Sequence, residues 1–349
     1  MAPLSDDLQT LVRDSHDSWL ITGVGGFIGS HILETLLELG RSVRGVDNFS
    51  TGQRENLDAV RQRVGEEAWA KFEMVEGDIR DEAACAALVE GVTAVLHQAA
   101  LGSVPRSIED PANTHANNVT GTLNLLDAAR QAGVKRFVYA SSSSVYGDHP
   151  GLPKVEDSIG KPLSPYAAGK LCTEEYAHSF ASSYGLDCVG LRYFNVFGPR
   201  QNPAGAYAAV IPKWIDALKN EEEVVLNGDP GISRDFTHVS NVVEANLRAA
   251  CAPIEPGSHV FNIACGGRIT LAELFDGIVA ALDRVGPSVP EGKREPVIGP
   301  PRPGDIAHSH ADIGHASRGL GYVPRIDFRE GLVDTVRWYL GAGEQGSSA

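Results

Sequence analysis

The residues best suited to chemistry in this sequence are a tyrosine and a lysine four positions apart, in Tyr166-Ala167-Ala168-Gly169-Lys170. A spacing of four puts both side chains on one face of a helix, and Pro165 suits the start of that helix. A phenol is a poor base at neutral pH, but a nearby ammonium group favours the phenolate. Such a pair could remove a proton from a hydroxyl group, although the same spacing also occurs in pairs that simply lie on a surface.

Four consecutive serines lie upstream of this pair, in Ser141-Ser142-Ser143-Ser144-Val145-Tyr146-Gly147. They follow the apolar segment RFVYA (136–140), which has the composition of a buried strand. Hydroxyl groups at the carboxyl end of such a strand can point into the same crevice as Tyr166, where one could hydrogen-bond a reacting hydroxyl group. A serine-rich turn without a catalytic role is the alternative, and the sequence leaves it open.

A glycine-rich turn near the N-terminus has the spacing of a phosphate-binding loop. Thr22-Gly23-Val24-Gly25-Gly26-Phe27-Ile28-Gly29 follows the apolar run WLIT (19–22) and opens a helical pattern. Here Gly23 permits a tight turn, Gly26 a close approach to a pyrophosphate, and Gly29 close packing of helix on strand. Asp47 ends the next predicted strand, where a carboxylate binds ribose hydroxyls and repels a 2′-phosphate. We therefore predict NAD as the cofactor, with Asp78 and Ile79 as candidates for the adenine contact.

These residues need a scaffold, and the first half of the chain supplies a regular one. Short apolar runs alternate with helical patterns such as 121–132, which predicts parallel strands joined by helical crossovers. The predicted strands are 19–22, 42–47, 72–77, 94–97, 136–140 and 187–191. In the second half Pro and Gly become frequent, and helices are indicated at 241–250 and 271–285. We predict an α/β fold with a Rossmann-type doubly wound parallel sheet (residues 1–192) and a smaller C-terminal substrate-binding lobe (193–349), between which the chain can cross more than once.

The charge balance excludes some partners. Thirty Lys and Arg against 45 Asp and Glu give a net charge of −15, which repels nucleic acid and anionic membrane surfaces. An anionic substrate would need a local cluster of Arg or Lys. The five cysteines form no metal-binding spacing, so we predict no metal site and reduced thiols. The acidic N-terminus has no signal-peptide pattern, and no apolar run is long enough to span a membrane, so a cytoplasmic protein is expected.

Several long segments resemble one enzyme family. The glycine pattern, the Tyr166/Lys170 pair, the serine run and RDFTHV (234–239) are similar to the extended short-chain dehydrogenases/reductases that act on nucleotide sugars. Three further segments resemble the bacterial UDP-N-acetylglucosamine 4-epimerases of surface-polysaccharide synthesis: HQAALGSVPRS (97–107), YGDHPGLPKVEDSIGKPLSPYAAGK (146–170) and LRYFNVFGPRQNPAGAYAAVIPKW (191–214).

The resemblance implies roles for individual residues. Tyr166 would be the base, Lys170 would bind the nicotinamide ribose and lower the pKa of the tyrosine, and Ser142 would be the catalytic serine. Cofactor contacts would come from Gly23, Gly26, Phe27, Ile28, Gly29, Asp47, Asn48, Asp78, Ile79, Gln98, Ala99, Ala100 and Tyr193, together with Tyr166 and Lys170. Substrate contacts would come from Ser103, Ser142, Ser143, Asn195, Ala209, Val210, Asn227, Arg234, Arg302, Asp305 and Ser309. Among these, Arg234 and Arg302 would hold the phosphates and Asp305 the uridine ribose.

The implied reaction is a transient oxidation at carbon 4 of a UDP-N-acetylhexosamine, with tightly held NAD and no net redox change. Relatives restricted to non-acetylated sugars have a bulky aromatic residue where this chain has Ser309, so an N-acetyl group is expected to fit; His310 replaces an apolar residue of this branch. The nearest rival is a 4-epimerase of UDP-N-acetylhexosaminuronic acids. A dehydratase lacks support because SSSSVYG contains no Asp-Glu pair, and a non-catalytic NAD sensor would usually lose Tyr166 or Lys170. The family also implies a homodimer built from two long helices per subunit.

Overall fold

A computed structural model describes residues 4–15, 18–203, 208–286, 288–300 and 308–345, with side chains up to residue 341. Within this part of the chain, no helix is long and apolar enough to cross a membrane.

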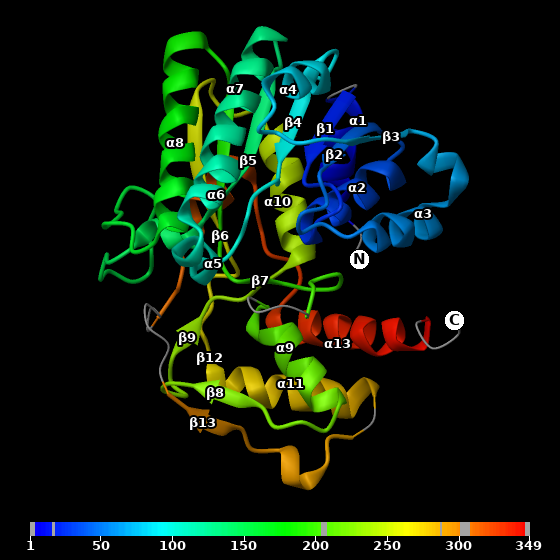
Figure 1. Ribbon diagram of the computed structural model, residues 1–349, viewed down its shortest axis with the longest axis vertical. Coiled ribbons are helices and arrows are strands. Elements are labelled where there is room, and N and C mark those ends of the chain that lie inside the picture. Colours follow the sequence, from blue (N-terminus) through cyan, green and yellow to red (C-terminus); the bar gives the residue numbers. More distant parts are fainter. Residues whose placement is uncertain (1–3, 16–17, 204–207, 287, 301–307, 346–349) are drawn as a thin grey trace.

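A parallel sheet of seven strands dominates the described residues (Figure 1). Its strands are β1 (Ser18–Thr22), β2 (Ser42–Asp47), β3 (Phe72–Glu76), β4 (Ala94–His97), β5 (Arg136–Ser142), β6 (Cys188–Tyr193) and β11 (Ser258–Ile263). Their order is β11-β6-β5-β4-β1-β2-β3, so the strand order reverses between β1 and β4. Ligands bind at such a reversal, outside the carboxyl ends of the strands. All six predicted strands are present, whereas β11 was not predicted from the sequence.

Helices cover both faces of the sheet, as a doubly wound fold requires. One apolar core joins the sheet to α1 (Asp6–Asp14), α2 (Phe27–Glu38), α3 (Arg54–Trp69), α10 (Val239–Cys251) and α12 (Gly314–Leu320). A second core on the opposite face contains α4 (Glu82–Val89), α7 (Gly121–Gln131) and α8 (Pro165–Tyr184). Shorter helical segments complete this part: α5 (Val104–Glu109), α6 (Pro111–His115), η1 (Ala116–Thr120) and η2 (Ser143–Tyr146). The predicted α/β, Rossmann-type fold is therefore confirmed.

The remaining elements gather in a smaller lobe at the bottom of Figure 1. Its core packs α9 (Val210–Lys219), α11 (Leu271–Val285) and α13 (Phe328–Gln345) around large apolar side chains such as Trp214 and Phe275. Short strands pair at its rim: β7 (Val196–Phe197) with β10 (Thr237–His238), β8 (Val225–Asn227) with β13 (Val297–Gly299), and β9 (Ser233–Arg234) with β12 (Ile269–Thr270); η3 (Glu291–Lys293) precedes β13. After residue 192 the chain builds this lobe and also returns to the larger one, where it adds β11 to the sheet and packs α10 and α12 against it. The predicted division at residue 192 stays a prediction.

Candidate active site

Tyr166 and Ser142 meet at the carboxyl end of β5. Helix α8 begins at Pro165, where the Ser164 hydroxyl accepts a hydrogen bond from the Ala167 N–H at 3.1 Å, so Tyr166 lies in the first helical turn. Ser142 is the last residue of β5, and its hydroxyl accepts a hydrogen bond from the Ser144 N–H at 3.1 Å. The Ser142 side chain also lies close enough to the Tyr166 phenol to favour its charged form. Two groups able to bind one sugar hydroxyl are thus next to each other.

Lys170 follows one turn later on the same face of α8. It is buried, and its Nζ donates a hydrogen bond to the Ala140 carbonyl oxygen at 2.7 Å. Burial lowers the pKa of Lys170 to about 8, while the nearby Glu174 carboxylate opposes that shift. Burial raises the pKa of Tyr166, and the nearby Ser142 side chain opposes that shift. The pKa of the phenol is therefore raised and not lowered as the resemblance implied, because burial outweighs the groups that favour the phenolate; the ammonium group of Lys170 lies 5.9 Å from the centre of the ring.

A cavity of about 350 Å³ lies at the carboxyl ends of the strands, next to Tyr166 and Lys170. Fourteen residues predicted to contact the cofactor line it: Gly23, Gly26, Phe27, Ile28, Gly29, Asp47, Asn48, Ile79, Gln98, Ala99, Ala100, Tyr166, Lys170 and Tyr193. Asp78 does not line the cavity. Its carboxylate is bound by the side chains of Arg80 and Asn48, which hold its pKa well below the usual range.

The glycine loop has no room for side chains. A Cβ atom on Gly29 would lie 2.2 Å from the Gly23 carbonyl oxygen, and one on Gly23 would lie 2.8 Å from the Ala99 nitrogen. Gly26 precedes α2 without a side-chain cap, so the first N–H groups of that helix are open to a ligand such as a phosphate. The Asp47 carboxylate accepts hydrogen bonds from the backbone N–H groups of Gly25 and Phe49, each at 2.8 Å, and therefore fixes this loop.

A second cavity, of about 160 Å³, lies in the smaller lobe and contains four predicted substrate contacts: Asn195, Val210, Asn227 and Arg234. One of its lining residues, Asn195, comes two positions after Tyr193, the last residue of β6, which lines the first cavity. Asn195 has a φ of 32°, a strained conformation for a residue other than glycine, and its side-chain amide donates to the Asp235 carbonyl oxygen at 3.1 Å. Strain of this kind persists where the surrounding structure enforces it, as it does at many functional sites.

The other predicted substrate contacts that the structure describes line neither cavity. Ser142 and Ser143 lie at the end of β5, and Ser103 precedes α5 with a strained φ of 108°. Ala209 precedes α9, and the Ser309 N–H donates to the Ser233 carbonyl oxygen at 3.0 Å, which puts Ser309 beside the strand that carries Arg234. Arg302 and Asp305 lie outside the described residues.

Several residues that line these cavities were not predicted from the sequence. In the first they are Val46, Ser50, Thr51, Gly52, Gly77, Leu101, Gly102, Asn117, Ala140 and Ser141; in the second they are Trp214, Val225, Phe236 and Leu271. The segment 50–52 had a usable signal, since it directly follows Asp47 and is rich in Ser, Thr and Gly. Asn246 of α10 had none, yet it binds both the Tyr193 hydroxyl, at 2.8 Å, and the Gln98 side chain, at 2.9 Å.

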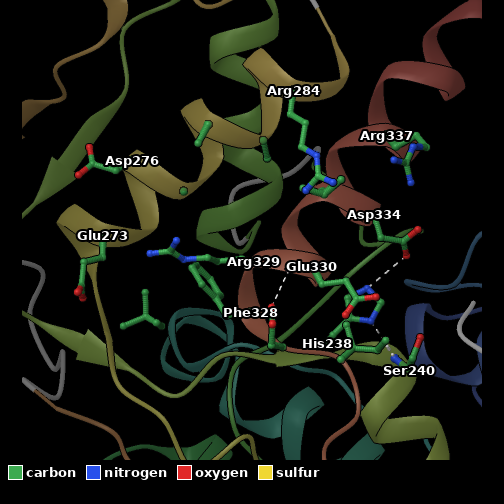
Figure 2. A pocket seen from close by; sticks show the side chains of 17 residues that line it. His238, Ser240, Glu273, Asp276, Arg284, Phe328, Arg329, Glu330, Asp334 and Arg337 are labelled. Carbon is green, nitrogen blue, oxygen red and sulfur yellow. Dashed lines mark hydrogen bonds and ion pairs between the residues drawn. The ribbon is translucent and has the colours of Figure 1, made fainter.

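A larger groove, of about 930 Å³, lies between α11 and α13 (Figure 2). Arg284 and Arg337 are at one end and Glu273 and Asp276 at the other, with the ion pair of His238 and Asp334 (3.5 Å) on its floor. It shares no lining residue with the two cavities above, and none of the predicted site residues line it. This groove is therefore larger than the other two cavities but is not the predicted active site.

Comparison with known proteins identifies the family. Residues 19–264, which include the glycine loop, Tyr166 and Lys170, match the model of the NAD-dependent epimerase/dehydratase family. The chain belongs to this family. NAD is therefore its cofactor, as predicted.

Individual members of the family resemble the whole chain. A UDP-glucose 4-epimerase of Mycolicibacterium smegmatis is 38% identical over 92% of this chain and 97% of its own length. A UDP-glucuronate 4-epimerase of Arabidopsis thaliana is 36% identical over 95% of this chain and 78% of its own length. The structure of a UDP-N-acetylglucosamine 4-epimerase of Methanobrevibacter ruminantium, in complex with UDP-N-acetylmuramic acid, has a TM-score of 0.84 at 37% identity and covers 94% of this chain and 99% of that one. Relatives acting on different sugars are thus about equally similar, and the family alone does not select the sugar.

Proposed function

We propose that this chain is an NAD-dependent 4-epimerase that interconverts UDP-N-acetylglucosamine and UDP-N-acetylgalactosamine through a 4-keto intermediate. The observation that carries the proposal is that Tyr166 and Lys170 line the same cavity as the glycine loop, with the Ser142 side chain next to the Tyr166 phenol. The second cavity is lined by Asn195, two residues after the end of β6, and by Arg234, whose guanidinium group suits a diphosphate. A UDP-sugar held there can extend its sugar toward Tyr166.

The residues of the first cavity fit NAD. The side-chain-free glycine loop and the open N–H groups of α2 suit a pyrophosphate, and the carboxylate of Asp47 suits ribose hydroxyls. Bound there, NAD would supply the acceptor and donor of one hydride. Lys170 and Tyr166 border the same cavity, which suits contact with the reactive end of the cofactor.

The protein side chains would handle the proton. The Tyr166 oxygen takes the proton of the 4-hydroxyl group as that carbon loses its hydride, and Ser142 holds the same hydroxyl group by a hydrogen bond. The positive charge of Lys170 favours the phenolate that this step requires. Once the planar 4-keto sugar had turned, Tyr166 would give the proton back to the 4-oxygen as the other face of carbon 4 regained a hydride. Arg234 would hold the diphosphate while the sugar turns.

Support for an acetylated sugar comes from Ser309. Its backbone is bound to Ser233, next to Arg234, and its side chain is smaller than the aromatic residue that the resemblance implies at this position in relatives restricted to non-acetylated sugars. A related structure of 37% identity holds UDP-N-acetylmuramic acid, itself an N-acetylated sugar nucleotide. The alternative, a UDP-N-acetylhexosaminuronic acid substrate, predicts faster conversion of UDP-N-acetylgalactosaminuronate than of UDP-N-acetylgalactosamine.

Label retention tests the reaction. Purified protein is incubated, without added cofactor, with UDP-N-acetylglucosamine that carries deuterium at carbon 4, and the products are followed by NMR and mass spectrometry. We expect UDP-N-acetylgalactosamine with the deuterium retained, because the hydride never exchanges with water. Loss of the label to solvent, or a requirement for stoichiometric added NAD, would contradict the proposal. The homodimer, the cytoplasmic location and the role in surface-polysaccharide synthesis stay predictions; analytical ultracentrifugation of the purified chain tests the first.

A further inference from the structure

Helix α8 presents three polar side chains to the end of β5 at intervals of four residues. Tyr166 lies next to Ser142, Lys170 donates to the Ala140 carbonyl oxygen, and Glu174 accepts a hydrogen bond from the Ser141 hydroxyl at 2.5 Å. The last three residues of β5 thus each have a partner on α8, and two of them are hydrogen-bonded to it. Tyr166 and Lys170 belong to the candidate active site, whereas Glu174 lines neither of its cavities.

The carboxylate of Glu174 is buried and fully occupied. Arg192 of β6 donates to it twice, through Nε at 2.9 Å and Nη2 at 2.7 Å, and Ser141 supplies the third hydrogen bond. Both partners of the ion pair are less than 10% exposed, at 5% for Arg192 and 7% for Glu174. Glu174 lines neither cavity, so it does not contact a ligand bound in either of them.

The contacts of Arg192 extend this network to a third strand. Its Nη1 donates to the Tyr146 hydroxyl at 3.1 Å, and that hydroxyl donates to the Asn262 side chain of β11 at 2.6 Å. Arg192 and Ser141 are also partners in the pairing of β5 with β6. The carboxyl ends of three neighbouring strands are therefore tied to one point on α8.

A contribution to folding stability is a weak explanation for the buried ion pair of Glu174 and Arg192. Removing two charges from water is costly, and buried ion pairs can often be replaced by apolar residues without loss of stability. The position of Glu174 matters more, because it lies one turn beyond Lys170 and its negative charge acts on the ammonium group. The other titratable groups around Lys170 in the described structure are Tyr166 on the same helix and His97 on β4, which burial keeps neutral at pH 7.

We propose that Glu174 is a positioning residue for the reaction at carbon 4, one that aligns the end of β5 with α8 and balances the charge of Lys170. The proposal rests on the proposed function. Through Ser141 it fixes the neighbouring Ser142 against Tyr166, and through its charge it keeps Lys170 cationic at neutral pH. A one-ångström displacement at a reacting centre can reduce a rate about 100-fold, so alignment at this distance has kinetic consequences.

Two substitutions separate the two effects. Glu174→Gln keeps the size and an acceptor for Ser141 but removes the charge; we expect about 10-fold lower turnover at pH 7, and an alkaline limb of the kcat/KM profile that moves to lower pH because Lys170 loses its proton more easily. Ser141→Ala removes the hydrogen bond from β5 to Glu174 and leaves the charges of Glu174 and Lys170 in place; we expect lower turnover with the alkaline limb unchanged. NAD binding to cofactor-stripped protein, measured by calorimetry across the same pH range, is expected to shift with Glu174→Gln alone.

Glu244→Gln is the matched control, since Glu244 is also buried and binds Arg248 of its own helix at 2.9 Å. It is expected to lower the melting temperature without moving either pH profile. If Glu174→Gln behaves like this control, the proposal is overturned; if Glu174→Gln does not fold, normal turnover of Ser141→Ala overturns it. Should the unmodified protein convert no UDP-sugar, the proposed function fails, and the calorimetric comparison still decides the role of Glu174.

Discussion

The ammonium group of Lys170 is bound to the carbonyl oxygen of Ala140, at 2.7 Å, and not to the phenol of Tyr166. Lysine and tyrosine therefore contact different parts of β5: Lys170 is hydrogen-bonded to Ala140, and Tyr166 lies next to Ser142 at the end of the strand. The positive charge is therefore carried by Lys170 and the proton is moved by Tyr166. Substitutions of the two residues should have different effects on turnover and on its pH dependence.

Removal of the Tyr166 hydroxyl is expected to stop the proton transfer without disturbing the fold. Tyr166→Phe should keep bound NAD and reduce turnover by about 100-fold or more, the usual contribution of a general base. Ser142→Ala should have a smaller effect, because it removes only a hydrogen bond. Tyr176→Phe, on the exposed side of the same helix, is the control and should be normal. Turnover is measured with UDP-N-acetylgalactosamine, and near-normal turnover of Tyr166→Phe would reject this residue as the base.

The pH dependence of kcat/KM is expected to report the charge of Lys170. Burial lowers the pKa of this lysine to about 8, so the group is cationic below that pH and becomes neutral as the pH rises through it. Because the cation favours the Tyr166 phenolate, we expect activity to fall on the alkaline side with a midpoint near that value. In Lys170→Arg the residual activity should lose this alkaline limb, since a guanidinium group stays charged. An alkaline limb that is identical in both proteins would assign it to another group.

Asp47 is expected to set the preference for NAD over NADP. Its carboxylate lines the cofactor cavity and also binds the backbone N–H groups of Gly25 and Phe49. Asp47→Ala should therefore weaken NAD binding and narrow the preference, because both the ribose contact and the support of the loop are lost. Asp58→Ala, on the exposed surface of α3, is the control. Dissociation constants of both cofactors are measured on stripped protein; tight NADP binding by the unmodified chain would show that Asp47 does not face the ribose.

Much of this arrangement could be predicted from the sequence, because it depends on local patterns. Apolar runs of four to six residues marked the first six strands, and the glycine spacing, Asp47 and Tyr166/Lys170 marked the cofactor cavity. Strand β11 was missed because SHVFNI contains His259 and Asn262, which weaken the apolar signal, although Asn262 is buried against Tyr146.

Contacts between distant segments could not be predicted in this way. Phe236 and Leu271 join Trp214 in the second cavity only because β9, β10 and α11 fold onto α9. Glu174 has the same spacing from Lys170 as Lys170 has from Tyr166, but this repeat acquires a meaning only when β5 lies alongside the helix. The pKa of Tyr166 is raised and not lowered as expected, because its burial, which depends on segments distant in the sequence, outweighs the effect of nearby groups.

Ser309 is expected to control sugar size through space and not through charge. An aromatic ring at this position would crowd an N-acetyl group at a cost of about 1–3 kcal/mol. Ser309→Tyr should therefore slow acetylated substrates by about 10-fold or more, with non-acetylated sugars much less affected. Ser309→Ala, which keeps the space, is the control and should retain the preference of the unmodified protein. Equal slowing of both substrate classes by Ser309→Tyr would show that this residue is not a size gate.

The central claim, a 4-epimerase of neutral UDP-N-acetylhexosamines, is tested most directly by one substrate comparison. Initial rates are measured for UDP-N-acetylgalactosamine, UDP-galactose and UDP-N-acetylgalactosaminuronate, on one preparation without added cofactor. A pocket that accepts the acetyl group rejects a smaller sugar only partly, so we expect UDP-N-acetylgalactosamine to react fastest and UDP-galactose about 10-fold or more slowly. Faster conversion of UDP-galactose or of the uronate, or no conversion of UDP-N-acetylgalactosamine, would contradict the claim.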